Sequence, residues 1–359
     1  MEFMTKTFHC RGMVARIARM VLGLQAAILV AAAGAAQEQL LPVIVDGKAG
    51  YINGSGAMVI PPEFCESHPF SDGFALVRRG NDPRLADTRL GYINAQGEFR
   101  PVPRAEMLGE YREGLARARF MDLKFSSGSS NCYIDLSGNV VIRTGYNDAG
   151  DFSEGLAWVE ERIHFLFILI SDKFGYVDRS GALAIPLRFE SAGSFSEGLA
   201  NVTLNGKRGF INHKGDLVIE PRFDGVGAFS TGLAAVRIGD NWGYIDTLGS
   251  IVIPTAFEDA RAFSEGHAAV KASGEWGFVS RSGRISIPPK FDDVSGFREG
   301  LSAAQMGGKW GYIDTTGAVV IRPQFRYAMA FTHGVAMVED EGGRGYIDRN
   351  GVYKWRPAR

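Results

Sequence analysis

The chain is poor in the residues that build covalent cross-links, metal sites and catalytic centres. Its 359 residues include only 3 cysteines and 6 histidines, and neither type shows the spacing of a metal site. The sequence also has no nucleophile elbow and no phosphate-binding loop. We therefore expect no catalytic residue, no metal ligand and no cofactor, in a protein that is not an enzyme.

A basic surface is missing as well. The 39 lysines and arginines are balanced by 40 aspartates and glutamates, which gives a formal net charge of −1, and no basic cluster stands out. Proteins that bind nucleic acid rely on such clusters to neutralise phosphates. The sequence therefore predicts no nucleic-acid partner.

Apolar runs longer than ten residues are confined to the amino terminus. Four basic residues precede an apolar stretch over residues 20–33, and small residues follow up to Ala36. This order predicts a secretory signal peptide over residues 1–36, and hence a periplasmic or extracellular protein. An uncleaved anchor is the alternative, although the stretch is short for a membrane helix, which needs about 20 residues. We expect no membrane span after cleavage.

Two cysteines remain after the signal peptide, Cys65 and Cys132. They occupy different places in the sequence repeat described next, and units of a repeat protein contact only their neighbours. We expect them to stay unpaired, with a disulfide as the alternative in an exported protein.

A short motif recurs through the rest of the chain. The dipeptide Gly-Tyr or a variant of it occurs nine times, and the last six copies follow one another at intervals of 34 residues. These six begin at Gly175, Gly209, Gly243, Gly277, Gly311 and Gly345. A constant interval of this length is typical of repeat proteins, in which each unit covers the apolar face of the next. We place the repeat domain at residues 40–357.

One unit, residues 233–266, shows the local structure to expect. Leu233–Ile238, Trp242–Asp246 and Ile251–Phe257 are short, rich in β-branched or aromatic residues, and separated by turn-forming residues. The pattern predicts a meander of three antiparallel strands. A glycine six residues after the motif glycine recurs in all nine units, here as Gly249, as a turn with positive φ requires.

Three further features of the unit indicate structure and not chemistry. The closing motif Phe-Ser-Glu-Gly, intact at Phe152, Phe195 and Phe263, predicts an aromatic ring in the seam between units. The Asp of Tyr-Ile-Asp is replaced by Asn or Ser in four units, which a turn-capping oxygen tolerates and a catalytic acid does not. Prolines place the third strand at a strand end or a sheet edge; they are Pro186, Pro221, Pro254, Pro288 and Pro323.

Lys309–Asp314, followed by Gly317 and Val320–Phe325, is a complete copy of the repeat. In this pattern the chain resembles the WG, or KWG, repeat family of bacterial proteins, over residues 43–357. The tryptophan is present at Trp242, Trp276 and Trp310, and it is replaced elsewhere by Ala49, Leu90, Asn131, Phe174, Arg208 and Arg344. The resemblance implies a β-rich repeat domain with a binding role.

Two arrangements of this all-β tandem repeat are possible. The chain enters with a first strand at Leu41–Val45 and leaves with a third strand at Val352–Trp355, so nine three-stranded units leave no strand to seal a ring. We therefore favour an open, solenoid-like β array, with β-propeller-like closure as the alternative.

Insertions in the first units give the clearest functional lead. They lengthen one hairpin of the unit, at Arg78–Arg89, Phe120–Ser130 and Glu161–Lys173, and the third contains an almost continuous apolar run over residues 163–170. Loops inserted at one position project from one side of a repeat array, where partners often bind. We predict that a protein partner contacts Ile163, Phe165, Phe167 and Leu169. Packing of this run on the array is the alternative, and membrane contact is a third possibility.

These observations favour an exported, non-enzymatic binding or scaffold protein whose protein partner is unknown. The alternative is a carbohydrate-binding or cell-envelope-binding protein, in which Trp242, Trp276 and Trp310 form a row of stacking rings. The row requires exposed tryptophans, whereas rings in the core or the seams would serve packing alone.

Overall fold

The computed structural model describes residues 39–80, 90–120, 131–165 and 168–357. The expected signal peptide and two of the three insertions, residues 81–89 and 121–130, lie outside these ranges. Residues Leu40–Arg359 form one compact unit. The secondary structure of the described residues is entirely β, in eight hydrogen-bonded sheets. The prediction of an all-β repeat fold is therefore confirmed.

The first three sheets contain the four longer-spaced units. The first has six strands and holds two units: β1 (Leu41–Val45), β2 (Lys48–Ile52), β3 (Met58–Ser71), β4 (Phe74–Arg79), β5 (Leu90–Asn94) and β6 (Phe99–Pro101). The second contains β7 (Ala105–Arg112), β8 (Leu115–Phe120), β9 (Asn131–Asp135) and β10 (Val140–Arg143). The third contains β11 (Asp148–Ala149), β12 (Leu156–Phe165), β13 (Ile168–Asp178) and β14 (Leu183–Phe189).

The remaining five sheets repeat one pattern of four strands. The fourth sheet contains β15 (Ser191–Ala192), β16 (Ala200–Leu204), β17 (Lys207–Ile211) and β18 (Leu217–Phe223), and the fifth contains β19 (Gly225–Val226), β20 (Leu233–Ile238), β21 (Asn241–Asp246) and β22 (Ile251–Phe257). The sixth contains β23 (Asp259–Ala260), β24 (His267–Ala272), β25 (Glu275–Ser280) and β26 (Ile285–Phe291), and the seventh contains β27 (Asp293–Val294), β28 (Leu301–Met306), β29 (Lys309–Asp314) and β30 (Val319–Phe325). The eighth contains β31 (Tyr327–Ala328), β32 (Val335–Asp340), β33 (Gly343–Asp348) and β34 (Tyr353–Trp355).

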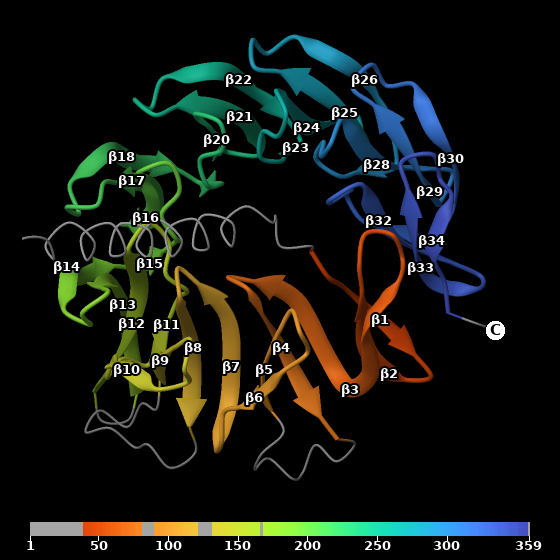
Figure 1. Cartoon of the computed structure of the whole chain (residues 1–359). Helices are drawn as coiled ribbons and strands as arrows, with labels where there is room; N and C mark the ends of the chain where they lie inside the picture. Colours follow the sequence, from red (N-terminus) through yellow and green to blue (C-terminus); the bar gives the residue numbers. More distant parts are fainter. Residues whose placement is uncertain (1–38, 81–89, 121–130, 166–167, 358–359) are drawn as a thin grey trace, which may run out of the picture. The chain divides into compact units, whose positions relative to one another are not determined.

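Each of these sheets has one more strand than the sequence predicts. A strand of two residues, such as β19, pairs with the first long strand of the unit through Gly225↔Arg237 and Val226↔Val236. Two residues are too few to show an alternating pattern, so the three-stranded prediction is wrong by this strand. Figure 1 shows the short strands β15 and β23 on the inner side of the ring of sheets, and β18, β22 and β26 at its rim.

The turns within a sheet form as the sequence predicts. Gly249 has a φ of +83°, a conformation that costs a residue with a side chain free energy. The carboxylate Oδ1 of Asp246 accepts hydrogen bonds from the N–H groups of Leu248 and Ser250, at 3.0 and 2.8 Å. The third-strand prolines lie on β14, β18, β22, β26 and β30, the last strand in the order of each sheet.

The apolar core lies in the seams between consecutive sheets. In one seam the hydroxyl of Tyr244 donates to the carbonyl oxygen of Arg261 at 2.8 Å, and its ring meets Phe263 edge-on with centroids 4.8 Å apart. Ser230 of one closing motif donates through Oγ to the carbonyl oxygen of Phe263 in the next, at 2.8 Å. The recurring Tyr, Phe and Ser thus place one aromatic pair and two hydrogen bonds in this seam; where the Tyr is replaced by Phe210 or Phe278, the aromatic pair remains without the hydroxyl.

A carboxylate reinforces several seams from the closing turn. Both oxygens of Glu197 accept hydrogen bonds from the next turn, from the N–H groups of Thr231 and Gly232 at 2.5 and 2.7 Å. Glu265 binds Glu299 and Gly300 in the same way, at 2.7 and 2.8 Å. We call this arrangement the turn clasp. It links consecutive sheets in one direction along the chain.

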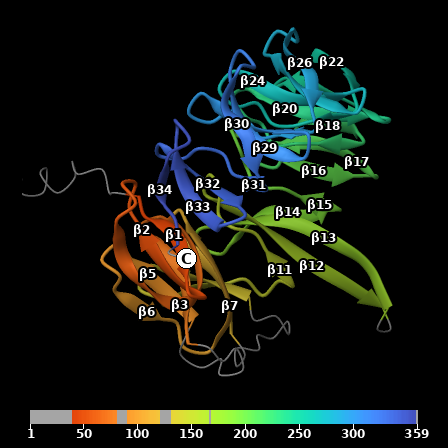
Figure 2. The same cartoon turned by 90° about the vertical axis from the view of Figure 1, so that its right-hand side faces the viewer.

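The two ends of the repeat domain meet in a seam of the same kind. The hydroxyl of Tyr346 in the last sheet donates to the carbonyl oxygen of Pro42 in the first, at 2.8 Å. Val43 and Ile52 pack with Val335 and Tyr346 in one buried cluster. Figures 1 and 2 both show β1 beside β33 and β34.

The sheets therefore close into a ring, which is the architecture of a β-propeller. The open, solenoid-like array that the sequence favours is wrong, and the alternative of propeller-like closure is correct. The strand count gave the wrong arrangement because side chains and one hydroxyl seal this ring. Among the described residues, the strands of each sheet are consecutive in the chain, so the first and last sheets share no strand.

Candidate interaction surface

The third insertion forms a projecting hairpin. Its strands, β12 and β13, are 10 and 11 residues long, whereas their counterparts β20 and β21 have 6 residues each. Figure 2 shows this hairpin extending beyond the neighbouring strands. The inserted residues have therefore lengthened two existing strands instead of forming a separate loop.

The end of this hairpin has no strand beside it among the described residues. On one side β11 reaches only as far as Glu160, through Asp148↔Glu160, and on the other β14 reaches only Phe174. Beyond these points the two strands pair with each other alone, through Ile163↔Ser171, His164↔Leu169 and Phe165↔Ile168. We call residues 163–171 the hairpin tip. The backbone of its described residues, 163–165 and 168–171, leaves N–H and C=O groups on both edges open to another strand.

Polar contacts fix the base of the tip. The N–H of Arg162 donates to Oδ1 of Asn147 at 2.8 Å, and its guanidinium lies 3.2 Å from the carboxylate of Glu160. The hydrogen bond to Glu160 raises the pKa of Arg162. The same contact recurs at this place in later units, where the N–H of Asn205 donates to Glu190 and the N–H of Gly239 donates to Asp224. The contacts of Arg162 hold the direction in which the tip leaves the sheet.

The structure locates the predicted partner-binding residues in part. Ile163 is 42% exposed. Phe165 ends β12 and Leu169 lies in β13, so the backbone brings both into the tip, while Phe167 lies outside the described residues. Their contact with a partner stays a prediction.

The three tryptophans of the alternative site lie in seams. Trp276 is 5% exposed, and the guanidinium carbon of Arg261 lies 4.2 Å from the centroid of its ring. Trp242 and Trp310 are half-buried and pack against the clusters of their seams. The three rings therefore do not form an exposed row, and nothing in their placement favours the carbohydrate alternative.

Side chains that could hold a metal ion do not gather in the described part of the chain. No set of three His, Cys, Asp or Glu side chains there could hold a metal ion. Cys65 and Cys132 are both free thiols, and burial raises the pKa of Cys132 to about 11, which keeps the thiol protonated and unreactive at neutral pH. The aspartate of Tyr-Ile-Asp caps turns, as in Asp246. That the protein is not an enzyme stays a prediction.

The described residues also include no helix with the length and apolar character that crossing a membrane requires.

A ring of small sheets, each built from a repeated sequence unit, defines the chain as a repeat β-propeller, and this fold suggests a binding or scaffold role. The family described as "WG containing repeat" matches residues 50–81, 133–162, 174–207, 209–242, 242–275, 276–310 and 310–343. These matches cover more than half of the chain, which belongs to this family. No curated protein matches the chain.

Several solved structures are distantly similar. Apo AztD from Citrobacter koseri is 12% identical, with 88% of this chain and 93% of that chain covered and a TM-score of 0.44. KlHsv2 with a replaced loop is 9% identical, with coverages of 77% and 92% and a TM-score of 0.40. A puromycin hydrolase is 11% identical, with coverages of 90% and 54% and a TM-score of 0.38. Likenesses this weak carry no argument about function.

Proposed function

We propose that this protein is an exported, non-enzymatic binding or scaffold protein that engages a protein partner through the hairpin tip. The observation that carries the proposal is the open backbone of residues 163–171, which pair only with each other among the described residues. An extended segment of a partner adds to such an edge by main-chain hydrogen bonds, and apolar side chains supply the burial.

The contrast with the other sheet edges supports this proposal. The outer strands β14, β18, β22, β26 and β30 also have a free edge, but each carries a proline, which cannot donate to an added strand and discourages pairing. The tip sequence Ile-His-Phe-Leu-Phe-Ile-Leu-Ile-Ser has neither a proline nor a charged residue. The tip thus lacks the proline that these five outer strands carry.

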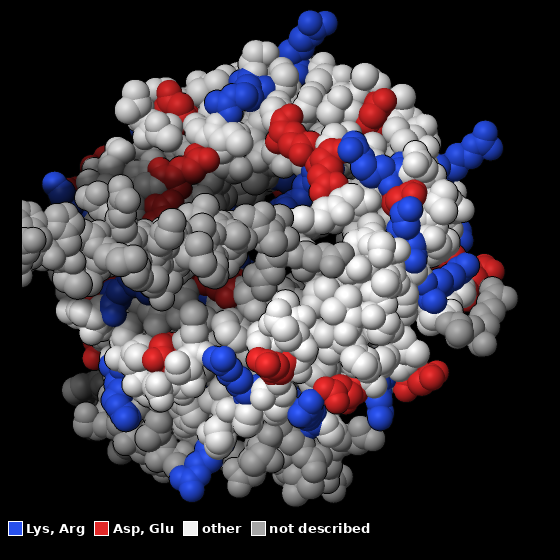
Figure 3. All heavy atoms as spheres, viewed as in Figure 1, with Lys and Arg blue, Asp and Glu red and all other residues white. Residues whose placement is uncertain are grey.

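The parts of the proposal that concern export and the kind of partner are supported mainly by the amino-acid sequence. The signal-like residues 1–36 support export to the periplasm or beyond. On the face that Figure 3 presents, positive and negative side chains are interspersed without a large basic patch, in keeping with a protein partner and not nucleic acid.

The test compares two triple variants of the full chain as baits in an extract of the cell envelope. One changes Phe165, Phe167 and Leu169 to Ser; the control changes Ile251, Val252 and Val218 to Ser, which are 50%, 41% and 41% exposed on β22 and β18. We expect the wild type and the control to retain the same partner and the tip variant to lose it, with unchanged melting temperature. Capture of the same partner by the tip variant would contradict the proposal. So would a sharply lower melting temperature without a loss of binding, because the tip would then pack on its own ring.

A further inference from the structure

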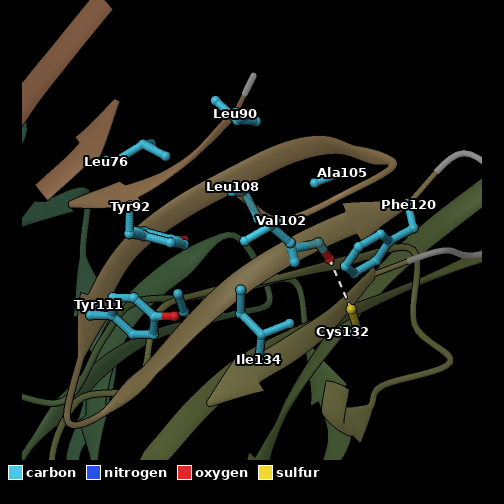
Figure 4. Packing of buried hydrophobic residues seen from close by; sticks show 12 residues of the cluster. Leu76, Leu90, Tyr92, Val102, Ala105, Leu108, Tyr111, Phe120, Cys132 and Ile134 are labelled. Carbon is cyan, nitrogen blue, oxygen red and sulfur yellow. Dashed lines mark hydrogen bonds between the residues drawn. The ribbon is translucent and has the colours of Figure 1, made fainter. Parts of the chain in front are cut away.

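A cavity of about 200 Å³ opens between the first sheet and strand β7 of the second. Its walls include the apolar residues Leu76, Leu90 and Leu108 and the charged residues Glu66, Arg78 and Glu106. Figure 4 shows Leu76 and Leu90 of the first sheet close to Leu108 and Ala105 of the next. The cavity therefore lies in the seam that follows the second repeat unit.

Strand register identifies this place as the tryptophan position of the repeat. Leu90 pairs with Arg78 across β4 and β5, as Trp242 pairs with Arg237 across β20 and β21 and as Trp276 pairs with a lysine in the next unit. The second unit therefore has a leucine where three other units place an indole ring.

A second ring is missing from the same place. In the other units the tryptophan pairs on its far side with a phenylalanine, as in Trp242↔Phe257 and Trp310↔Phe325. This phenylalanine stands fourteen residues after the motif glycine, and at that interval the second unit has Ala105. In the structure the N–H of Val102 donates to the carbonyl oxygen of Leu90 at 3.0 Å, while Ala105 pairs with Phe120 of β8. Neither Val102 nor Ala105 is aromatic, so Leu90 has no ring beside it at this place, which leaves the seam less filled.

The other units show what occupies the position when it is filled. The ring of Trp242 packs with the seam cluster around Leu233 and Val270, and the guanidinium carbon of Arg237 lies 6.0 Å from its centroid. In the second unit Arg78 stands in the place of Arg237 and pairs with Glu66 at 2.7 Å. A cation is therefore available beside the empty position, as it is beside the filled one.

The size of the cavity limits the ligand to one ring. An apolar protein cavity of about 150 Å³ accommodates benzene, whereas sites for drug-sized molecules measure roughly 300–1,000 Å³. We propose that this cavity binds a single planar aromatic ring from outside the chain, in the place of the missing tryptophan and beside Arg78. The site lies away from the hairpin tip, and the proposal does not depend on the function proposed above.

The first test uses the full chain with labelled methyl groups in an NMR titration. N-acetyl-L-tryptophanamide should shift the methyl signals of Leu76, Leu90 and Leu108 in a saturable manner, and N-acetyl-L-leucinamide should not. Free indole distinguishes the source of the ring: equal binding of indole points to a small aromatic molecule, and binding of the amide alone points to an aromatic residue of a peptide. Shifts at none of these methyls, or equal shifts with the leucine amide, would overturn the proposal.

A cavity-filling variant provides the second test. Leu90→Trp places an indole ring at the wall of the cavity and should weaken binding of N-acetyl-L-tryptophanamide by at least about tenfold while leaving the melting temperature equal or higher. The control, Leu248→Trp, adds an indole at a residue that is 80% exposed and should keep the wild-type affinity. Unchanged affinity in a folded Leu90→Trp variant would refute the site. If this variant does not fold, the titration of the wild type decides.

Discussion

Asp314 illustrates how a single side chain defines a turn of the repeat. Its Oδ1 accepts hydrogen bonds from the N–H of Thr316 at 2.9 Å, the hydroxyl of Thr316 at 2.6 Å and the N–H of Ala318 at 3.0 Å. The hydroxyl of Thr316 lowers the pKa of this carboxyl below its usual value. Asn212 makes the same two backbone contacts, to Lys214 and Asp216, which explains why Asp and Asn exchange at this position.

Replacing Asp314 with Asn should keep the backbone hydrogen bonds of the turn and remove the negative charge of the side chain. A carboxyl whose pKa is lowered by folding stabilises the protein above the unfolded pKa of about 3.9 and loses that contribution as the pH falls through the folded pKa. Asp314→Asn should therefore be slightly less stable than the wild type at pH 7, because a charged acceptor binds more strongly, and the two proteins should converge as the pH falls through the lowered pKa of Asp314. Denaturant titrations between pH 2 and 7 measure this, with Asp240→Asn in an exposed hairpin as the control. A constant difference at all pH values would contradict it.

Glycines show how far single residues could be interpreted from the sequence. The turn glycine, such as Gly249, was predictable because its interval is constant and turns with positive φ favour glycine. The role of the motif glycine was not. A Cβ on Gly311 would lie 2.4 Å from the carbonyl oxygen of Ile321 on the adjacent strand, a contact between strands that a one-dimensional pattern does not reveal.

The motif that forms the turn clasp recurs in the sequence, but its hydrogen bonds to the next turn were not predictable from that motif. The Glu of Phe-Ser-Glu-Gly looks like a solvated charge in the sequence, but in the structure it binds the N–H groups of the following turn. In units where another residue replaces this Glu, the hydrogen bonds to the next turn are altered. In one closing turn Thr231 replaces the Glu with the same left-handed conformation, at a φ of 53°, and a threonine is too short to repeat the two contacts.

Thr231→Glu should therefore complete the clasp to the next turn, at Glu265 and Gly266. Arg281 already binds the carbonyl and hydroxyl oxygens of Thr231, and Arg179 in an earlier unit pairs with the clasp residue Glu113 at 3.5 Å, so the new carboxylate has a cation beside it. We expect the free energy of unfolding to increase by about 0.5–1 kcal/mol, the net value of an exposed hydrogen-bonded contact. Thermal denaturation checks this, and Thr247→Glu in an exposed turn should give no such gain. A lower melting temperature for Thr231→Glu would contradict the interpretation.

The projecting hairpin was predictable as an insertion but not as an open edge. The apolar run after Ile163 was evident in the sequence. The neighbouring strands β11 and β14 end before this run. Where they end depends on the pairing of the whole sheet, so it could not be predicted from the run itself.

At the scale of the whole molecule, the seam between the last and first sheets determines whether the chain is a ring. Val43 is 3% exposed and lies in this seam, whereas its neighbour Ile44 is 54% exposed. The sequence did not distinguish a ring from an open array, because the residues of this seam are those of every other seam and their contact joins positions about 300 residues apart.

Val43→Asp should open the ring, because it places an unpaired carboxylate in the closing cluster. We expect it to lower the free energy of unfolding by about 3 kcal/mol or more and to increase the radius of gyration in small-angle scattering. Ile44→Asp, on the outward face of the same strand, should change stability by no more than about 0.5 kcal/mol. Equal effects of the two substitutions would show that this seam does not hold the ring closed.

The hydrogen bond between Tyr346 and Pro42 bears on whether the ring tolerates circular permutation. The closing seam uses the same tyrosine-to-carbonyl hydrogen bond as the internal seams at Tyr176, Tyr244 and Tyr312, so the closing contacts are not special to the chain ends. A circular permutant that starts at another unit, with the present ends joined by a flexible linker, should reach the same ring.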